Sequence, residues 1–305
     1  MLNITGKRSL FLIISEIIIL IGIIALVVFG LKPGIEFSSG SILTINFEQE
    51  VVQSELQEEL ANLGYDNAII QRTGTGDFFI RTQELTAPER LALEEDLSAR
   101  FGPLTEREFN SVSSMVAAET VNNAIIAVGV AALGILLYIT WAFRRMPKPF
   151  HYGVCAIIAL VHDVVLVTGI FAILGAIMGW EINLMFITGV LAVIGYSINN
   201  TVVVFDRIRE NLRRGVHPDF EMVVNSSLVD TLSRSLNTSL TTLFVVLALL
   251  LFVGASIQNF ALVMLIGIIV GTYSSLFVAP TLLIVWEKGE WGRLVFLPRG
   301  KTKEA

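Results

Sequence analysis

The sequence predicts a multispanning α-helical membrane protein: six transmembrane helices, with one ferredoxin-like α+β extracytoplasmic domain between the first two. Three observations carry this prediction. The chain of 305 residues is 54% hydrophobic and only 16% charged, whereas a soluble domain carries about 25% charged residues. Its mean hydropathy is +0.72. One long polar interval, residues 32–120, separates the first apolar run from the others. This composition excludes a soluble enzyme, a disordered protein and a disulfide-rich secreted scaffold.

Six apolar runs reach the roughly 20 residues that a helix needs to cross a bilayer core. Four of them contain no Asp, Glu, Lys or Arg, the first contains Glu16, and the third contains Asp163. Glu16 is close enough to a membrane edge to extend its carboxylate toward the surface. In chain order the runs are Leu10–Leu31, Val121–Phe143, Tyr152–Trp180, Ile182–Phe205, Leu236–Ser256 and Phe260–Trp286.

The distribution of charge predicts the orientation. Residues 32–119 hold 6 basic and 16 acidic side chains, a net of −10, while the rest of the chain holds 15 basic and 11 acidic, a net of +4. The cations outside the interval flank alternate span ends: Lys7 and Arg8; Arg144, Arg145 and Lys148; Arg207 to Arg234; and Lys288 onward. The loops around Trp180–Glu181 and Ile257–Asn259 have none, so the positive-inside rule places both termini in the cytoplasm. The predicted domains are a cytoplasmic N-terminus (1–9), the first span (10–31), the extracytoplasmic domain (32–120), a five-helix membrane region (121–286) with a cytoplasmic basic segment (206–235), and a cytoplasmic tail (287–305).

The polar interval shows a β-α-β-β-α-β pattern of hydrophobicity, which is typical of the ferredoxin-like fold. Thr86 is suited to cap the second helix, and Gly102 with Pro103 to end it. Gly74-Thr75-Gly76 marks a hairpin between the second and third strands. The predicted elements are a strand at Ser41–Phe47, a helix at Val51–Leu63, strands at Ala68–Thr73 and Asp77–Thr82, a helix from Thr86 to Phe101, and a strand at Leu104–Val112.

Asp163 is the strongest candidate for a functional residue. It lies 11 residues into the third span, about 17 Å along a helix and so close to the bilayer midplane. A carboxylate there is costly and by default indicates function. No Lys or Arg lies within the six runs to neutralise it. We therefore predict that Asp163 takes up and releases a proton; the alternative is a structural role. Its neighbour His162 is either a second relay member or a packing residue.

Polar side chains gather in the fourth and fifth spans. Tyr196, Asn199 and Asn200 fall on one helical face, and the fifth span begins with Asn237, Thr238, Thr241 and Thr242. The two sets are predicted to line a hydrated path from the cytoplasm toward Asp163. Helix-to-helix hydrogen bonding requires the same residue types and is the alternative. Gly267, Gly271 and Ser275 form a ridge of small residues in the sixth span, which favours close helix packing.

A basic motif follows the fourth span. Its charged residues are Asp206, Arg207, Arg209 and Glu210, and Arg234 follows further along. A helix with this charge is expected to contact anionic headgroups. The single cysteine, Cys155, and three scattered histidines give no disulfide and no metal-ligand spacing. No phosphate-binding loop is present, so we predict no enzyme activity, no cofactor and no metal. The acidic net charge also argues against a nucleic-acid partner.

Two motifs make the chain resemble the SecD/SecF family of bacterial protein-export subunits, on its SecF side, within the resistance-nodulation-division superfamily. The specific matches are Ile194-Gly-Tyr-Ser-Ile-Asn-Asn-Thr201 running into Phe205-Asp-Arg-Ile-Arg-Glu-Asn211, and the pair His162-Asp163. Gly34-Ile-Glu-Phe-Ser-Ser-Gly40 and Arg234 with Thr238-Ser-Leu-Thr-Thr242 match more weakly. The sequence departs from the family pattern at Asn200, where the family has Asp, at Glu36, where it has Asp, and at Ser39, where it has Gly.

The resemblance implies a function in protein transport. Such a subunit associates with SecD and the SecYEG channel in the bacterial cell (inner) membrane. The pair is expected to use the proton-motive force to help the preprotein complete translocation after the ATP-dependent step of SecA. Because Asn200 cannot titrate where the family has Asp, any proton transfer is expected to depend more on Asp163. Two alternatives stay open: half of a proton-coupled small-molecule or lipid exporter of the same superfamily, and a structural scaffold for SecD.

Overall fold

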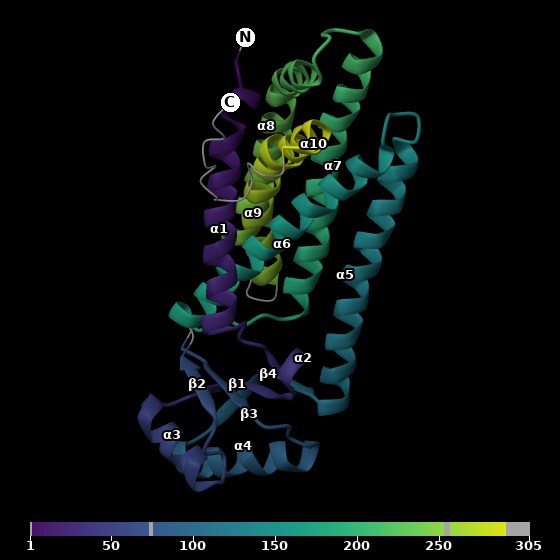
Figure 1. The fold of residues 1–305 in the computed structure, drawn as a ribbon. Coiled ribbons are helices and arrows are strands. Elements are labelled where there is room, and N and C mark those ends of the chain that lie inside the picture. The colour runs from purple at the N-terminus through teal and green to yellow at the C-terminus, as the bar shows by residue number, and fades with distance from the viewer. Residues whose placement is uncertain (1, 73–75, 253–256, 291–305) are drawn as a thin grey trace, which may run out of the picture. The chain divides into compact units, whose positions relative to one another are not determined.

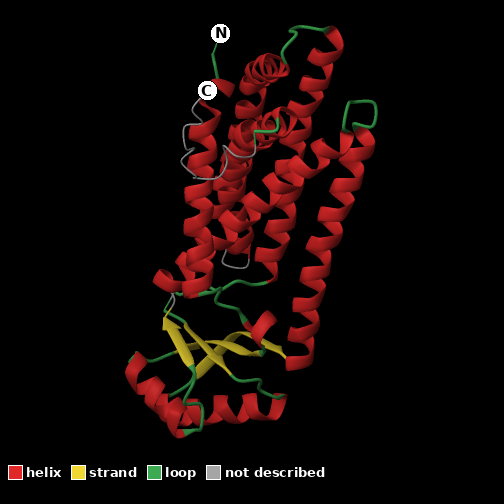
Figure 2. Ribbon diagram, in the orientation of Figure 1, coloured by secondary structure: helices red, strands yellow, loops and turns green. Residues whose placement is uncertain are grey.

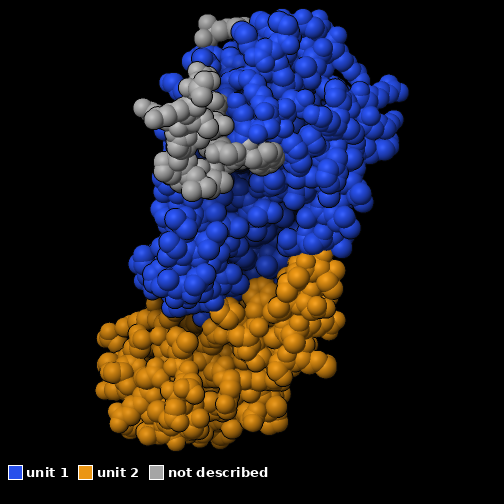
Figure 3. All heavy atoms as spheres, viewed as in Figure 1, with its two compact units in different colours: residues 1–32, 127–305 blue, residues 33–126 orange. Residues whose placement is uncertain are grey.

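The computed structural model describes residues 2–72, 76–252 and 257–290. The chain divides into two compact units (Figure 3). One comprises residues 1–32 and 127–305, and the other comprises residues 33–126. Each unit has its own hydrophobic core. The last residues of the predicted tail, 291–305, and the end of the fifth predicted span, 253–256, lie outside the described residues.

Six helical stretches among the described residues are long and apolar enough to cross a membrane, as predicted. Figures 1 and 2 show them as a helical bundle. The first begins with the short turn η1 (Thr5–Lys7). They are α1 (Arg8–Phe29), α5 (Ser114–Ala142), α6 (Pro149–Met178), α7 (Leu184–Arg214), α8 (Phe220–Phe252), and a sixth stretch made of α9 (Gln258–Tyr273), η3 (Ser274–Val278) and α10 (Ala279–Lys288).

The basic segment 206–235 is largely helical. The fourth predicted span ends at Phe205, but α7 continues to Arg214, and α8 begins at Phe220, before the apolar run at Leu236. The helix persists because it gains charge pairs one turn apart: Arg214 lies 2.7 Å from Glu210, and Arg207 lies 2.6 Å from the same carboxylate. Such i,i+3 and i,i+4 pairs support an exposed helix. The chain becomes too polar to remain in the membrane after Phe205, but the helix continues to Arg214.

The sixth span contains a π-helical turn, η3. The N–H of Ala279 bonds to the carbonyl oxygen of Ser274, five residues earlier. Pro280 follows at once, and proline has no N–H to donate to the carbonyl four residues back. A π turn inserts one extra residue into a helix, and such turns are frequent at functional sites. The sequence analysis treated this span as one regular helix, so η3 was missed.

The helices α7 and α9 run side by side in the same direction, and their contacts recur every four residues along both helices. A Cβ added to Gly267 would lie 2.1 Å from Val193, one added to Gly271 would lie 3.0 Å from Ser197, and one added to Gly189 would lie 2.8 Å from Val263. Each glycine therefore sits against a larger side chain of the other helix. This supports the packing role predicted for Gly267 and Gly271.

The second unit is an α+β fold with one four-stranded sheet, as predicted. Strands β1 and β4 and strands β1 and β3 are antiparallel neighbours, and β2 pairs antiparallel with β3, which gives the order β2-β3-β1-β4. Leu43, Ile45, Leu56, Leu60 and Leu97 are fully buried between the sheet and its helices. The elements are α2 (Ile35–Ser38), β1 (Gly40–Phe47), α3 (Gln53–Asn62), β2 (Ile69–Arg72), β3 (Phe78–Thr82), α4 (Ala87–Phe101) and β4 (Leu104–Val112).

Two local signals in this unit can be compared with the prediction. Thr86 caps α4: its N–H donates to Oε2 of Glu89 at 2.8 Å, and Gly102, at φ +89°, ends the helix. The predicted hairpin turn at Gly74-Thr75-Gly76 falls largely on residues 73–75, outside the described residues. The short helix α2 was not predicted.

The turn before β1 explains part of the Gly-Ile-Glu-Phe-Ser-Ser-Gly motif. Ser39 has φ +62° and ψ 168°, a region populated almost solely by glycine. Gly40 has φ +124°, and a Cβ there would lie 2.6 Å from the carbonyl oxygen of Thr82. The turn therefore favours glycine at both positions, and this chain supplies only one.

Candidate functional site

Asp163 lies at the centre of the buried polar site of the membrane unit. Its side chain is 0% exposed. The hydroxyl of Ser197, on α7, donates to Oδ2 of Asp163 at 2.6 Å, and the hydroxyl of Ser274, on η3, donates to the same oxygen at 2.8 Å. Three segments of the bundle thus meet at one carboxyl group. Hydrogen bonds to an ionised acceptor are among the stronger ones in proteins.

His162 contacts the other carboxyl oxygen. Its Nδ1 lies 3.0 Å from Oδ1 of Asp163. The ring is 3% exposed and stacks against Tyr273, with ring centroids 6.3 Å apart. The other nitrogen, Nε2, is buried and has no hydrogen-bond partner among the described residues. Successive residues of a helix point about 100° apart, yet the structure brings these two side chains into contact.

A second polar cluster surrounds Ser239 of α8. Its hydroxyl lies within hydrogen-bond distance of the hydroxyl of Tyr196 at 3.1 Å, of that of Thr272 at 2.6 Å and of Nδ2 of Asn200 at 3.5 Å. Two of the predicted relay residues, Tyr196 and Asn200, therefore meet on one hydroxyl. Ser239 and Thr272 were not predicted as site residues, although Ser239 lies within the motif Thr238-Ser-Leu-Thr-Thr242.

The other predicted polar residues lie elsewhere. The hydroxyls of Thr238, Thr241 and Thr242 bond to carbonyl oxygens of their own helix, and Asn237 is exposed. They do not face α7, because Ser239 occupies the inner face of α8. The hydrated path that these residues were expected to line stays a prediction. Ser275, which was predicted to pack, is buried and hydrogen-bonds to Thr201 and to the carbonyl oxygen of Ser197.

Asn199 is separated from Asn200. It is exposed and lines a crevice of about 490 Å³ between α5 and α7, together with Gly134 and Tyr138. Asn200 is 3% exposed and turned toward α8. The shared face predicted for Tyr196, Asn199 and Asn200 thus holds only for Tyr196 and Asn200.

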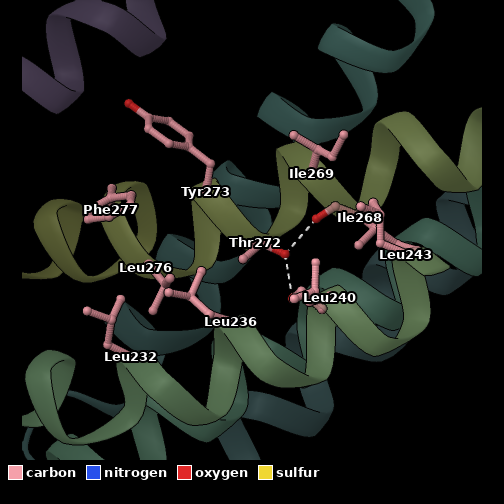
Figure 4. Close-up of a pocket in the computed structure, with 11 residues that line it drawn as sticks. Leu232, Leu236, Leu240, Leu243, Ile268, Ile269, Thr272, Tyr273, Leu276 and Phe277 are labelled. Atoms are coloured by element: carbon pink, nitrogen blue, oxygen red, sulfur yellow. Dashed lines mark hydrogen bonds between the residues drawn. The ribbon is translucent and has the colours of Figure 1, made fainter.

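A pocket of about 370 Å³ lies between α8 and α9 (Figure 4). Leucines of α8 and Ile268, Ile269 and Phe277 supply most of its wall. The hydroxyl of Thr272 bonds to Ser239 and to the carbonyl oxygen of Ile268, as the dashed lines in Figure 4 show. A wall of this kind favours hydrocarbon over water, so the pocket does not match the predicted hydrated path.

The charged motif after the fourth span forms ion pairs within the unit. Arg207 lies 2.9 Å from Asp230 of α8. Arg209 pairs with Asp206 and lies over the ring of Phe143, 5.4 Å from its centroid. Arg234 is exposed, with no ion pair among the described residues. The motif therefore connects α7 to α8 through an ion pair. Its contact with anionic headgroups stays a prediction.

The site brings together a carboxyl group, a histidine and two hydroxyls. The described residues contain no group of three or more His, Cys, Asp or Glu side chains that could hold a metal ion. A buried carboxyl group, a histidine and two hydroxyls can hold and pass a proton. The fold and the site together define a multi-pass membrane protein with a titratable group inside its helical bundle.

The chain belongs to the SecD/SecF family of protein-export membrane proteins, on the SecF side. Residues 93–289 match the model of the SecD/SecF C-terminal region, and residues 24–51 match the SecD/SecF GG motif. The family match defines a component of the Sec protein translocase, and not an enzyme.

Named relatives agree with this assignment. The chain is 45% identical to the protein translocase subunit SecF of Thermobaculum terrenum, over 96% of each chain. It is 31% identical to the subunit SecDF of Bacillus subtilis, over 94% of this chain and 38% of that one. The crystal structure of SecDF from Thermus thermophilus superposes with a TM-score of 0.81 at 33% identity, covering 94% of this chain and 39% of that one.

Proposed function

We propose that this chain acts with a SecD protein to couple the proton-motive force to the completion of preprotein translocation through SecYEG, after the ATP-dependent step of SecA. The observation that carries the proposal is Asp163, which is fully buried and bonded to His162, Ser197 and Ser274. A structural carboxylate in a membrane is normally paired with a cation. Among the described residues, no Lys or Arg is bonded to Asp163.

SecD is the proposed partner because relatives carry both parts in one chain. This chain accounts for 38% of the SecDF subunit of Bacillus subtilis, which leaves most of that protein for a second part. We place the complex in the bacterial inner membrane, with residues 32–120 outside and both termini in the cytoplasm. The cations at Arg144, Arg145 and Lys148 and those of segment 206–235 support this orientation, since the opposite short loops at Trp180–Glu181 and Ile257–Asn259 have none.

The energy available is sufficient for mechanical coupling. One charge that crosses 100 mV gains about 2.3 kcal/mol, which shifts a two-state equilibrium about fifty-fold. Protonation of a carboxyl group at the junction of α6, α7 and η3 changes the hydrogen bonds of all three segments.

The test is Asp163→Asn in proteoliposomes that contain SecD, SecYEG and SecA. The amide has nearly the shape of the carboxyl group, and the serine hydroxyls can rotate to accept from it. We expect normal insertion and association with SecD, and loss of the stimulation by a proton gradient. Asp206→Asn is the matched control, because Asp206 is exposed and lies beyond the apolar run. Full stimulation in the Asp163→Asn variant would favour the scaffold alternative.

A further inference from the structure

The two oxygens of the Asp163 carboxyl group have different surroundings. Oδ2 accepts from the hydroxyls of both Ser197 and Ser274. Within the described part of the chain, the one hydrogen bond at Oδ1 is with the ring nitrogen Nδ1 of His162, at 3.0 Å. A hydroxyl has one proton to donate, so both donors at Oδ2 are committed while the carboxylate is charged. A proton placed on Oδ2 would break one of these bonds, whereas a proton on Oδ1 would lie between Oδ1 and Nδ1.

Ser274, which bonds to Asp163, is the first residue of the π turn. Ser274 and Ser275 are adjacent and both 0% exposed. Ser274 bonds to Asp163, while Ser275 bonds to the carbonyl oxygen of Ser197 at 3.1 Å. The hydroxyl of Ser274 also lies 3.2 Å from the carbonyl oxygen of Gly271, which is its usual helical acceptor. The shorter bond to the carboxylate, 2.8 Å, is the charge-assisted and stronger one.

We propose that Ser274 is a positioning residue: together with Ser197 it holds Oδ2 of Asp163 and so directs proton exchange to Oδ1 and His162. In this step a proton arrives on Nε2 of His162, which has no partner among the described residues. The Nδ1–H bond then breaks, its proton moves to Oδ1, and an O–H bond forms. The imidazole is neutral before and after the step, and the carboxylate becomes a neutral acid. The inference rests on the proposed role of Asp163 in proton coupling.

The neighbours of the Asp163 carboxyl group allow the contribution of Ser274 to be measured separately from that of any charged side chain. His162 is on the same helix, Ser197 is on α7 and Ser274 is on η3. Tyr273 of α9 stacks against His162, and its hydroxyl accepts from Ser15 of α1 at 3.4 Å. His162 is the one titratable side chain bonded to Asp163 among the described residues. A change at Ser274 therefore acts on Asp163 without removing a charge.

The experiment follows the infrared band of the protonated carboxyl group of Asp163, in the full-length protein in liposomes, across a pH titration without a gradient. The band is assigned by its loss in Asp163→Asn. Removing a hydrogen bond to a charged group destabilises that form. In Ser274→Ala we therefore expect the pH of half-protonation to rise by about one unit, which is a tenfold change.

Ser275→Ala is the matched control, because it removes an equally buried hydroxyl from the same turn without touching Asp163; its midpoint should stay within about 0.3 of the wild type. Ser274→Thr keeps the hydroxyl and should restore the wild-type midpoint. Should Ser274→Ala not fold, Ser274→Cys, a weak donor, should give a smaller upward shift. Equal midpoints in the two alanine variants, a wild-type midpoint in Ser274→Cys, or no titrating band of Asp163 would overturn the inference. The proposed function is tested separately, by export in the Asp163→Asn variant.

Discussion

Gly267→Ala is expected to be the most damaging single-methyl addition in the membrane unit. The new Cβ would lie 2.1, 2.6 and 2.9 Å from three atoms of Val193, whereas carbon atoms in contact prefer about 3.5–4.0 Å. Val193 is 1% exposed, and a β-branched side chain in a helix has one strongly preferred rotamer, so it cannot turn aside. Overpacking costs about 1–3 kcal/mol. The better helix propensity of alanine returns about 1 kcal/mol, so we expect a net loss of up to about 2 kcal/mol.

The assay is unfolding of the full-length protein by SDS in mixed micelles. Gly195→Ala is the matched control, since Gly195 lies on α7 and nothing is within 4 Å of its added Cβ. This control should be neutral or stabilised by up to about 1 kcal/mol. Val193→Ala combined with Gly267→Ala should recover part of the loss, as expected of directly coupled sites. If Gly267→Ala unfolds at the same SDS fraction as Gly195→Ala, the close packing of α7 on α9 is refuted.

Two further predictions concern the sheet-containing unit. Ser39→Gly should stabilise it by about 1 kcal/mol, because the backbone of Ser39 lies in a region that strains any residue with a Cβ; thermal unfolding that shows no gain would contradict this. Burial and the adjacent carboxyl group of Glu106 raise the pKa of Glu94 from 4.5 to about 7. The folded state then holds a proton that the unfolded chain releases, so this stabilisation is complete below pH 4.5 and is lost as the pH rises through 7. Glu94→Gln should flatten the fall in the unfolding temperature over that range, and an unchanged pH profile would argue against the shift.

Hydrophobicity was sufficient to predict the two units and the six membrane helices, because run length and alternation are local properties of the sequence. It also identified Asp163, since an acid in an apolar run is conspicuous. The ends of α7 and α8 were not predictable in this way. Hydropathy registers where a helix leaves the membrane, and charge pairs such as Arg214–Glu210 then extend the helix beyond that point.

The partners of Asp163 were harder to identify. Ser197 and Ser274 are small residues with no strong preference, and each becomes important only through its neighbour in space. Pro280 gave a usable signal, because proline inside an apolar run predicts a disturbed helix just before it. The separation of Asn199 from Asn200 depends on where α5 and α8 pack against α7, which no spacing along α7 encodes.

The offset between α7 and α9 has a mechanical consequence. Gly189, Val193 and Ser197 face Val263, Gly267 and Gly271, four residues apart on both helices. A slide by one helical turn, about 5.4 Å, would bring Val193 against Val263, with no glycine to receive either. A slide in that direction is therefore blocked, whereas the opposite slide would bring Val193 against Gly271 and Gly189 against Gly267. Ser197 on α7 and Ser274 on η3 both donate to Oδ2 of Asp163 on α6. Under the proposed function, a movement of α6 relative to α7 and η3 would therefore change both hydrogen bonds at once.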